Sequence, residues 1–169
     1  MRMPRQEEKD QSVIRAFIES NEYCMLSVVD GDKPYSVPLN FGFTMEENGK
    51  LTLYFHTSKG GRLYDILHAK PQGDIPVAFS MVNLEGVLRF EDACAWDLVY
   101  QSILGEGNLV IVSEAADKEA ALSLLMDCLG AQPGYSFSPV RVQATTIYRV
   151  DVSDYHMKKS KKDSSHLQK

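Results

Sequence analysis

Alternating apolar and polar positions recur along most of the chain and predict a fold built mainly from β-strands. Short alternating runs bounded by turn residues are typical of antiparallel strands, whereas apolar residues spaced three and four apart indicate helices. No regular exchange of strand and helix occurs, so the pattern favours an antiparallel barrel of about six strands with helices packed outside it. The strand-like segments are residues 23–29, 35–43, 51–57, 75–82, 86–93, 99–112 and 145–152.

Three segments carry helical spacing. Residues 7–20 predict an amphipathic helix across one end of the barrel, a short helix follows Gly61, and residues 115–129 predict a third helix that stops at Gly130. Their apolar faces comprise Val13, Ile14, Phe17 and Ile18; Leu63, Ile66 and Leu67; and Ala121, Leu122, Leu125 and Met126. Residues 132–140 form a loop rich in Pro, Gly and Ser, either a lid over a ligand or a connection, and we expect a connection.

The segment 35–43 has an unusual second face. Its apolar positions alternate with small or polar residues, so one face packs into the core and something other than the core contacts the other face. Pro38 has no N–H for a strand ladder, and Gly42 weakens a strand. The segment is therefore expected to be an edge, a bulge or a place where a ligand approaches the backbone.

Length, composition and charge exclude several classes of function. The 169 residues fit one domain, which we place at residues 1–157, followed by a polar, disordered tail at 158–169. A formal net charge of -5 argues against a nucleic-acid partner. No apolar run reaches the roughly 18 residues that span a bilayer, and the N-terminus is too polar for a signal peptide. We therefore expect a cytoplasmic protein with no membrane association.

The spacing of cysteines and histidines argues against the common disulfide and metal arrangements. The three cysteines are widely separated and form no CxxC pair. The four histidines show no short ligand spacing such as HExxH. We expect free thiols and no metal site.

Residues 54–62, with the sequence YFHTSKGGR, carry the most informative chemistry. Two hydroxyls, two cations and two glycines lie between a predicted strand and a predicted helix. A phosphate suits this environment, because backbone N–H groups, hydroxyls and the helix dipole point at the anion while Lys59 or Arg62 supplies charge. The alternative is a solvated loop in which Ser58 caps the helix and the two cations are surface charges.

Several other side chains have both a structural and a functional interpretation. His56 could be a structural residue of its strand or could act beside the anion loop. Asn40 could cap a turn or could hydrogen-bond a heterocycle that lies along residues 37–42. Trp96 and Tyr100 are four residues apart and could form part of the core or stack on a planar ligand.

The order of these motifs resembles that of the Nim-type flavoproteins, the nitroimidazole-resistance branch of the pyridoxamine phosphate oxidase-like superfamily. The resemblance runs from about residue 23 to residue 129. Relatives often carry a second basic residue where this chain has Leu63, so one phosphate contact is expected either to be missing or to come from elsewhere in the chain. The matching segments are VPLNFGF at 37–43, LYFHTSKGGR at 53–62, Asp65, Leu67, Cys94, Trp96, Tyr100, Ser102, Gly105 and Gly107.

The resemblance implies a mainly β, α+β fold: a six-stranded antiparallel split β-barrel with flanking helices, which forms a homodimer with two FMN molecules at the subunit interface. FAD is the less favoured cofactor. His56 would face the reactive edge of the flavin as the candidate catalytic residue, and Trp96 and Ser102 would approach from the partner subunit. The remaining implied contacts are Val37, Pro38, Leu39 and Asn40 beside the ring, and Thr57, Ser58, Lys59 and Arg62 around the phosphate.

These expectations favour an FMN-dependent oxidoreductase. NADH or NADPH would deliver hydride to the flavin, and a small organic molecule, such as a nitro-aromatic compound, would take the electrons. His56, an imidazole with an ordinary pKa of about 6.5, would donate a proton or orient the substrate. Two alternatives stay open: an oxidase of pyridoxal-type phosphates, and a flavin or haem store or sensor in which His56 or His156 ligates the haem.

Overall fold

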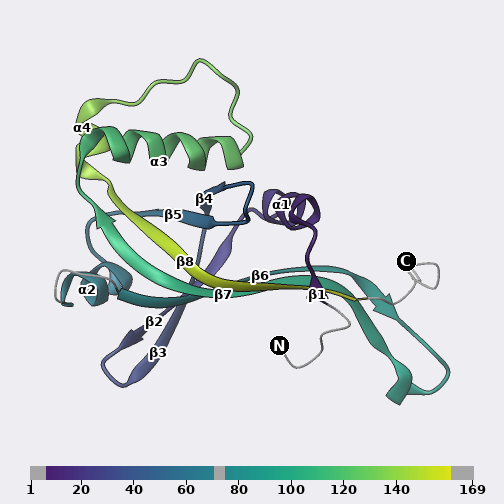
Figure 1. The fold of residues 1–169 in the computed structure, drawn as a ribbon. Coiled ribbons are helices and arrows are strands. Elements are labelled where there is room, and N and C mark those ends of the chain that lie inside the picture. Colours follow the sequence, from purple (N-terminus) through teal and green to yellow (C-terminus); the bar gives the residue numbers. More distant parts are fainter. Residues whose placement is uncertain (1–6, 71–74, 161–169) are drawn as a thin grey trace.

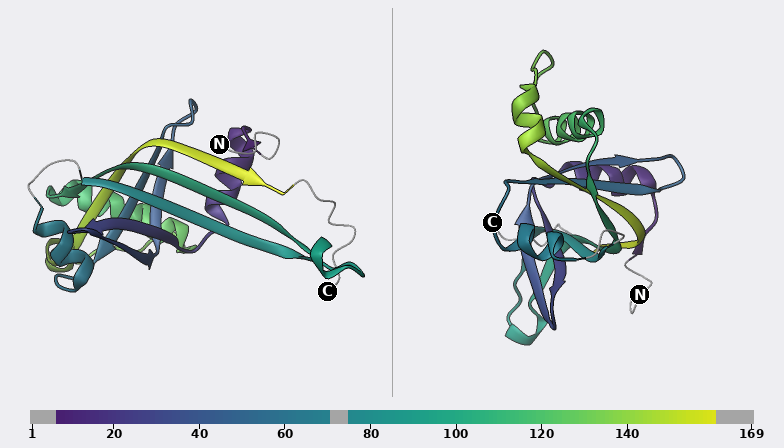
Figure 2. Two further views of the ribbon diagram at one scale, coloured as in Figure 1. Left: turned by 90° about the horizontal axis from the view of Figure 1, so that it is seen from below. Right: turned by 90° about the vertical axis from the view of Figure 1, so that its left-hand side faces the viewer.

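The computed structural model describes residues 7–70 and 75–160, which form one antiparallel sheet with helices around it (Figures 1 and 2). The strands are β1 (Glu7–Glu8), β2 (Cys24–Asp30), β3 (Lys33–Leu39), β4 (Phe41–Met45), β5 (Leu51–Thr57), β6 (Ile75–Leu88), β7 (Asp97–Val112) and β8 (Thr146–Lys159). The helices are α1 (Gln11–Glu19), α2 (Arg62–His68), α3 (Ala115–Cys128), α4 (Pro139–Ala144) and the short 3-10 helix η2 (Ala93–Ala95). Within these residues no helix is both long and apolar enough to cross a membrane.

The strand order makes a split barrel. Seven strands follow the path β3-β2-β6-β7-β8-β5-β4, and β1 pairs with β8 beside it. β3 and β4 are consecutive in the chain, yet they lie at opposite ends of this path and only Asn40 separates them. The sheet therefore closes on itself through a covalent link rather than through a ladder of hydrogen bonds, and the two edge strands meet at the split.

The architecture confirms the predicted α+β split barrel with flanking helices, with seven strands on the main path instead of six. The segment 35–43, expected as one strand, is divided at Asn40 because its two halves pair with different neighbours. The segment 75–93, expected as two strands, contains the single strand β6, whose irregular positions are absorbed by a bulge between Leu84 and Gly86.

The C-terminal third contains two further differences. Residues 139–144 form α4, so the expected loop 132–140 is shorter at its end. The loop connects α3 to α4, and the Tyr135 hydroxyl donates to the Ser123 carbonyl oxygen and to Asp127 Oδ1, both at 3.4 Å. β8 continues to Lys159, which places the first two residues of the expected tail in the sheet; residues 161–169 of that tail lie outside the described residues.

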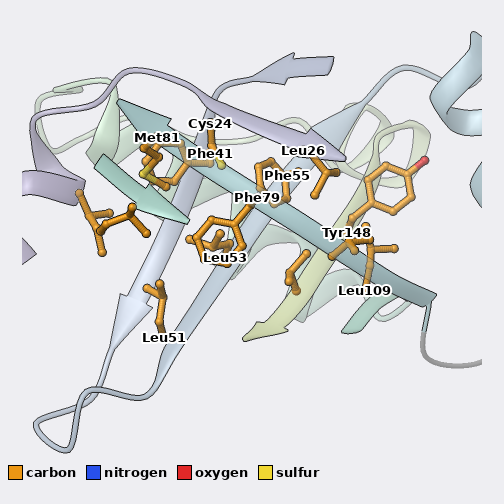
Figure 3. Packing of buried hydrophobic residues seen from close by; sticks show 14 of the residues in the cluster. Cys24, Leu26, Phe41, Leu51, Leu53, Phe55, Phe79, Met81, Leu109 and Tyr148 are labelled. Atoms are coloured by element: carbon orange, nitrogen blue, oxygen red, sulfur yellow. The ribbon is translucent and has the colours of Figure 1, made fainter. Parts of the chain in front are cut away.

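The core fills the interior of the barrel. Figure 3 shows side chains from several strands gathered in one cluster, among them Leu53, Phe55, Phe79 and Tyr148. The amphipathic pattern of α1 buries Ile14, Phe17 and Ile18 against this cluster, as the sequence predicted, although the first residues of the expected helix 7–20 form strand β1 instead, because they pair with β8. At the start of α1, the Asp10 side chain accepts from the Ser12 N–H at 2.9 Å, which is a typical N-cap.

The outer face of β4 and β5 is covered by α3, and Gly42 makes this close approach possible. A Cβ atom at Gly42 would lie 2.7 Å from the carbonyl carbon of Leu124 and 2.7 Å from the backbone nitrogen of Leu125. Because backbone atoms of a helix cannot retreat one at a time, only glycine permits this contact. α3 is thereby held against the strand pair that leads into the loop after Thr57.

Candidate functional site

The β5–α2 loop, residues 58–61, leaves its backbone open to solvent. Gly60 and Gly61 have φ values of 110° and 95°, a region that favours glycine. A Cβ atom at either position would meet no heavy atom within 4 Å. Gly61 is the N-cap of α2, and no side chain caps this helix, which rules out the interpretation of Ser58 as its cap. With only seven residues, α2 contributes little as a dipole, so any anion bound here would depend on side chains and loop N–H groups.

Lys59 in this loop and Arg62 at the start of α2 differ in their contacts. Arg62 Nη2 lies 2.9 Å from Asp30 Oδ2, and its Nε lies 3.2 Å from the same oxygen. The guanidinium carbon also lies 4.5 Å from the centroid of the Tyr35 ring. Lys59 is exposed and forms no ion pair in the described part of the chain. The loop therefore offers one positioned cation and one free cation.

Thr57 points into the barrel and contacts a buried phenol. Its hydroxyl donates to the Tyr148 hydroxyl oxygen at 3.3 Å, and Tyr148 is fully buried. Burial raises the pKa of the Tyr148 phenol above its ordinary value. This pair joins the last residue of β5 to β8, so it fixes the position at which the β5–α2 loop begins.

His56 lies on the opposite face of β5 from Thr57, because successive side chains alternate along a strand. It is paired in register with Ile147, and its Nδ1 atom is buried without a hydrogen-bond partner among the described residues. Burial also lowers the pKa of the imidazole, which favours its neutral form near pH 7. A buried ring nitrogen without a partner is costly, by about 1–3 kcal/mol, and marks a place where a ligand atom could bind.

Residues 37–40 lie at the split. Val37 and Leu39 are partly buried against the core, while Pro38 and Asn40 are exposed on the other face. β3 pairs only with β2, so the backbone groups on its other side carry no ladder hydrogen bonds. Tyr35, which touches Arg62, is two residues before Val37, or roughly 7 Å along the strand. The structure therefore brings the β3 segment and the β5–α2 loop together.

Trp96 and Ser102 are not brought to the β5–α2 loop within one chain. Trp96 follows η2 at the tip of the β6–β7 hairpin, and this tip and α2 lie at opposite ends of the molecule (Figure 1). The Trp96 Nε1–H donates to the Phe90 carbonyl oxygen at 2.9 Å, and the side chain remains half exposed. Ser102 is ten residues from Val112, the β7 residue nearest the loop, or roughly 33 Å along the strand.

Sequence reasoning missed the contacts that organise the site. Asp30 lies 32 positions from Arg62, and no local pattern connects them. Tyr148 was part of a predicted strand, but its bond to Thr57 depends on the pairing of β5 with β8. The outward direction of His56 did carry a signal, because Phe55 and Leu53 alternate with it as the apolar positions of β5.

Other chemistry is limited within residues 7–70 and 75–160. No group of three or more His, Cys, Asp and Glu side chains there is arranged to hold a metal ion. All three cysteines are free: Cys24 is buried, Cys94 is exposed and Cys128 is intermediate.

Comparison with known proteins connects this geometry to a family. A family model described as pyridoxamine 5'-phosphate oxidase matches residues 10–159. No curated protein matches the chain.

Several solved structures share the fold. A candidate 5-nitroimidazole antibiotic resistance protein from Bacteroides thetaiotaomicron VPI-5482 is similar with a TM-score of 0.71 and 22% identity, over 90% of this chain and 85% of that chain. A FAD and heme binding protein from Mycobacterium smegmatis is similar with a TM-score of 0.78 and 18% identity, over 93% and 74%. A flavocytochrome from Azotobacter vinelandii is similar with a TM-score of 0.70 and 18% identity, over 93% and 70%. At these identities the likeness establishes the fold.

Proposed function

The chain belongs to the pyridoxamine 5'-phosphate oxidase family, and we propose that it is a flavin-binding oxidoreductase with FMN as its cofactor. One observation carries the proposal: an edge strand with free backbone groups and a loop with two hydroxyls and a free cation are joined through the contact of Arg62 with Tyr35. A flavin mononucleotide needs both features at once, since its ring and its phosphate lie at opposite ends of one molecule. The likeness to proteins described as FAD-binding and as a flavocytochrome supports a flavin.

The phosphate would bind at the β5–α2 loop. Lys59 supplies an unpaired charge, Arg62 supplies a fixed fork of donors, and the open loop backbone supplies N–H groups. Thr57 and Ser58 supply hydroxyls, although Thr57 must share its hydroxyl with Tyr148. Leu63 is buried, so it replaces the second cation of many relatives with a core contact.

The ring system would lie along residues 37–40. The unpaired backbone groups of β3 can donate to and accept from the polar edge of a flat heterocycle. Pro34 and Pro38 occur in this strand, as expected for an edge strand that has a partner on one side only. Asn40 is exposed at the split and offers an amide to the same ligand edge.

His56 is the proposed proton-handling residue. Its Nδ1 has no partner among the described residues, and the depressed pKa keeps it neutral, so it can accept a proton or orient a substrate group. Because His56 lies on the other face of β5 from Thr57, a flavin with its phosphate near Thr57 would have to pass around the end of β5 to bring its ring near His56. A bound flavin would supply two-electron chemistry, taking hydride from NADH or NADPH and passing electrons to a small organic acceptor such as a nitro-aromatic compound.

The proposed active form is a homodimer. Val82, Leu84, Leu98 and Leu104 are exposed by 67%, 60%, 47% and 53% on one face of the β6–β7 hairpin. Grouped exposed apolar side chains of this kind mark interaction sites. A partner docked here could also bring its Trp96 and Ser102 positions toward the β5–α2 loop, from which both lie far within their own chain.

A variant pair tests this assembly. Leu104→Glu should convert the dimer to a monomer in light scattering after gel filtration and should reduce flavin retention. Leu129→Glu is the matched control, because Leu129 is 54% exposed and lies at the end of α3. A wild-type monomer, or equal behaviour of the two variants, would contradict a dimer through this face.

The cofactor itself is tested by absorbance. The purified protein is mixed with FMN, FAD or riboflavin, desalted, and then titrated with NADH or NADPH without oxygen. A retained flavin spectrum that bleaches supports the oxidoreductase, and acceptors can then be compared. Retention without bleaching favours a flavin store, and loss of every flavin on desalting rejects the proposal.

The geometry disfavours one alternative. His156 was a candidate haem ligand, but its Nδ1 lies 3.1 Å from Glu7 Oε1 and its Nε2 lies 3.2 Å from Asp154 Oδ2. Both ring nitrogens are therefore engaged, and haem ligation would have to break one of these contacts. A Soret band on addition of haem, retained in a His156→Ala variant, would direct the search to His56.

A further inference from the structure

The β2–β3 hairpin holds Arg62 from two sides. Asp30, the last residue of β2, accepts from Arg62 Nη2 at 2.9 Å and from Nε at 3.2 Å through one carboxylate oxygen. Tyr35, in β3, presents its ring to the guanidinium at 4.5 Å. Arg62 is the first residue of α2, so this contact joins α2 to the β2–β3 hairpin, two parts of the chain that no strand pairing connects.

This arrangement leaves part of the guanidinium fork available. The group carries five N–H donors in one plane, and Asp30 uses the edge formed by Nε and Nη2. The edge that includes Nη1 forms no hydrogen bond among the described residues, and the Arg62 side chain is 55% exposed. An anion can therefore bind in a bidentate manner without displacing Asp30.

Asp30 has two opposing effects on such an anion. Its negative charge weakens the attraction between the loop and a phosphate. Its contact also removes rotational freedom from a long side chain before the ligand arrives, which lowers the entropic cost of binding. The pair is exposed on both sides, by 55% and 40%, so solvent screens the charge effect, whereas the loss of freedom is unaffected by screening.

We infer that Asp30 and Tyr35 are positioning residues that orient Arg62 toward a ligand phosphate, and that they set the preference for a phosphorylated flavin over its dephosphorylated form. The inference rests on the proposed flavin site. Tyr35 also lies two residues before Val37, so the same contact fixes the spacing between the phosphate and ring parts of that site.

The chain provides a matched control in the same turn. Asp32 is exposed and forms no hydrogen bond or ion pair with any described residue. Asp30→Ala and Asp32→Ala remove the same charge from nearly the same place, so a long-range charge effect should act alike in both. Only Asp30→Ala releases Arg62. The measurement is fluorescence titration of each variant with FMN and with riboflavin, which lacks the phosphate.

Asp30→Ala should weaken FMN binding by about 3- to 10-fold and leave riboflavin binding unchanged, as expected for loss of one well-placed hydrogen-bonded group. Asp32→Ala should bind FMN as tightly as the wild type or slightly more tightly. If Asp30→Ala binds FMN no more weakly than Asp32→Ala, the positioning role is wrong. If the wild type binds neither flavin, the proposed function fails, and this inference fails with it.

Tyr35→Leu provides a second measurement that does not depend on the carboxylate. The substitution keeps an apolar side chain against the core but removes the aromatic face under Arg62. It should also lower FMN affinity selectively, by about 2- to 5-fold. An equal loss for FMN and riboflavin would indicate a general disturbance of β3 and would overturn the assignment for Tyr35.

Discussion

Gly105 is a position where the packing of the barrel can be tested quantitatively. It is paired in register with Phe79, and a Cβ atom there would lie 2.4 Å from Cζ of the Phe79 ring and 2.9 Å from the carbonyl oxygen of Asp154. Ordinary contacts lie at 3.4–4 Å, so the buried ring would have to move by about 1 Å. Gly105→Ala should therefore destabilise the protein by about 2 kcal/mol through overpacking.

A second substitution separates this mechanism from a general intolerance of alanine. Phe79→Leu shortens the side chain that clashes and should by itself cost about 1–2 kcal/mol. In the double variant the new methyl group occupies part of the vacated space, so the two effects should fall short of additivity by about 1 kcal/mol or more. Gly107→Ala is the control, because its Cβ atom would lie 2.4 Å from the carbonyl oxygen of Asp151, which Phe79→Leu does not move.

The assay is urea unfolding, followed by circular dichroism at one fixed protein concentration, because assembly would make stability concentration-dependent. A loss of 2 kcal/mol corresponds to a fall of about 4–8 °C in Tm for a chain of this size. The reasoning is refuted if Gly105→Ala costs less than about 0.5 kcal/mol. It is equally refuted if Phe79→Leu rescues Gly107→Ala as well as it rescues Gly105→Ala.

Four further outcomes are expected. In fluorescence titrations, Lys59→Gln should weaken FMN binding by about 3- to 10-fold and leave riboflavin binding unchanged. Lys50→Gln is the control, because Lys50 forms an ion pair with Glu46, and this variant should change the affinity for neither flavin. His56→Ala should lower turnover in a reductase assay while the desalted protein keeps its FMN. Burial lowers the pKa of His56 in the folded state, so as the pH falls the unfolded chain binds a proton at this residue before the folded chain does. The free energy of unfolding should therefore fall as the pH drops below about 6.5. His56→Gln should flatten that part of the stability profile, as measured by urea titrations at several pH values. Burial raises the pKa of the Cys24 thiol to about 12, so a thiol reagent at pH 8 should modify the exposed Cys94 quickly and Cys24 only on unfolding, as counted by mass spectrometry.

The local sequence pattern was enough to predict those strands and helices whose ends are marked in the sequence. β5 spans residues 51–57 as expected, and α3 differs from its expected range by one residue. Both have clear ends: a glycine-containing loop follows β5, and Gly130 follows α3 with a φ of 74°. The sequence also placed Thr57, Ser58, Lys59 and Arg62 at one strand end, since all four lie within the six consecutive positions 57–62 and cannot be far apart.

The pairing of strands determined one boundary that the local sequence pattern did not reveal, the break between β3 and β4 at Asn40. Apolar residues at 35, 37, 39 and 41 keep a period of two across Asn40, so nothing local marks the change of strand. The break exists because residues before it pair with β2 and residues after it pair with β5. The contacts of Asp30 and Tyr35 with Arg62 also depend on long-range folding, which brings the β2–β3 turn beside α2.

The split explains why ligand-binding features would gather at this part of the barrel. A fully closed barrel leaves no backbone group unpaired, whereas an open edge invites pairing with another chain. Here β3 stays an edge, and its two prolines make it a poor template for a further strand. A flat heterocycle with its own donors and acceptors can use such an edge without extending the sheet. In the proposed site, Asn40, which crosses the split, and Arg62, which contacts Tyr35 of β3, would both face that ligand, so the proposed site would follow from the absence of a hydrogen-bond ladder between β3 and β4.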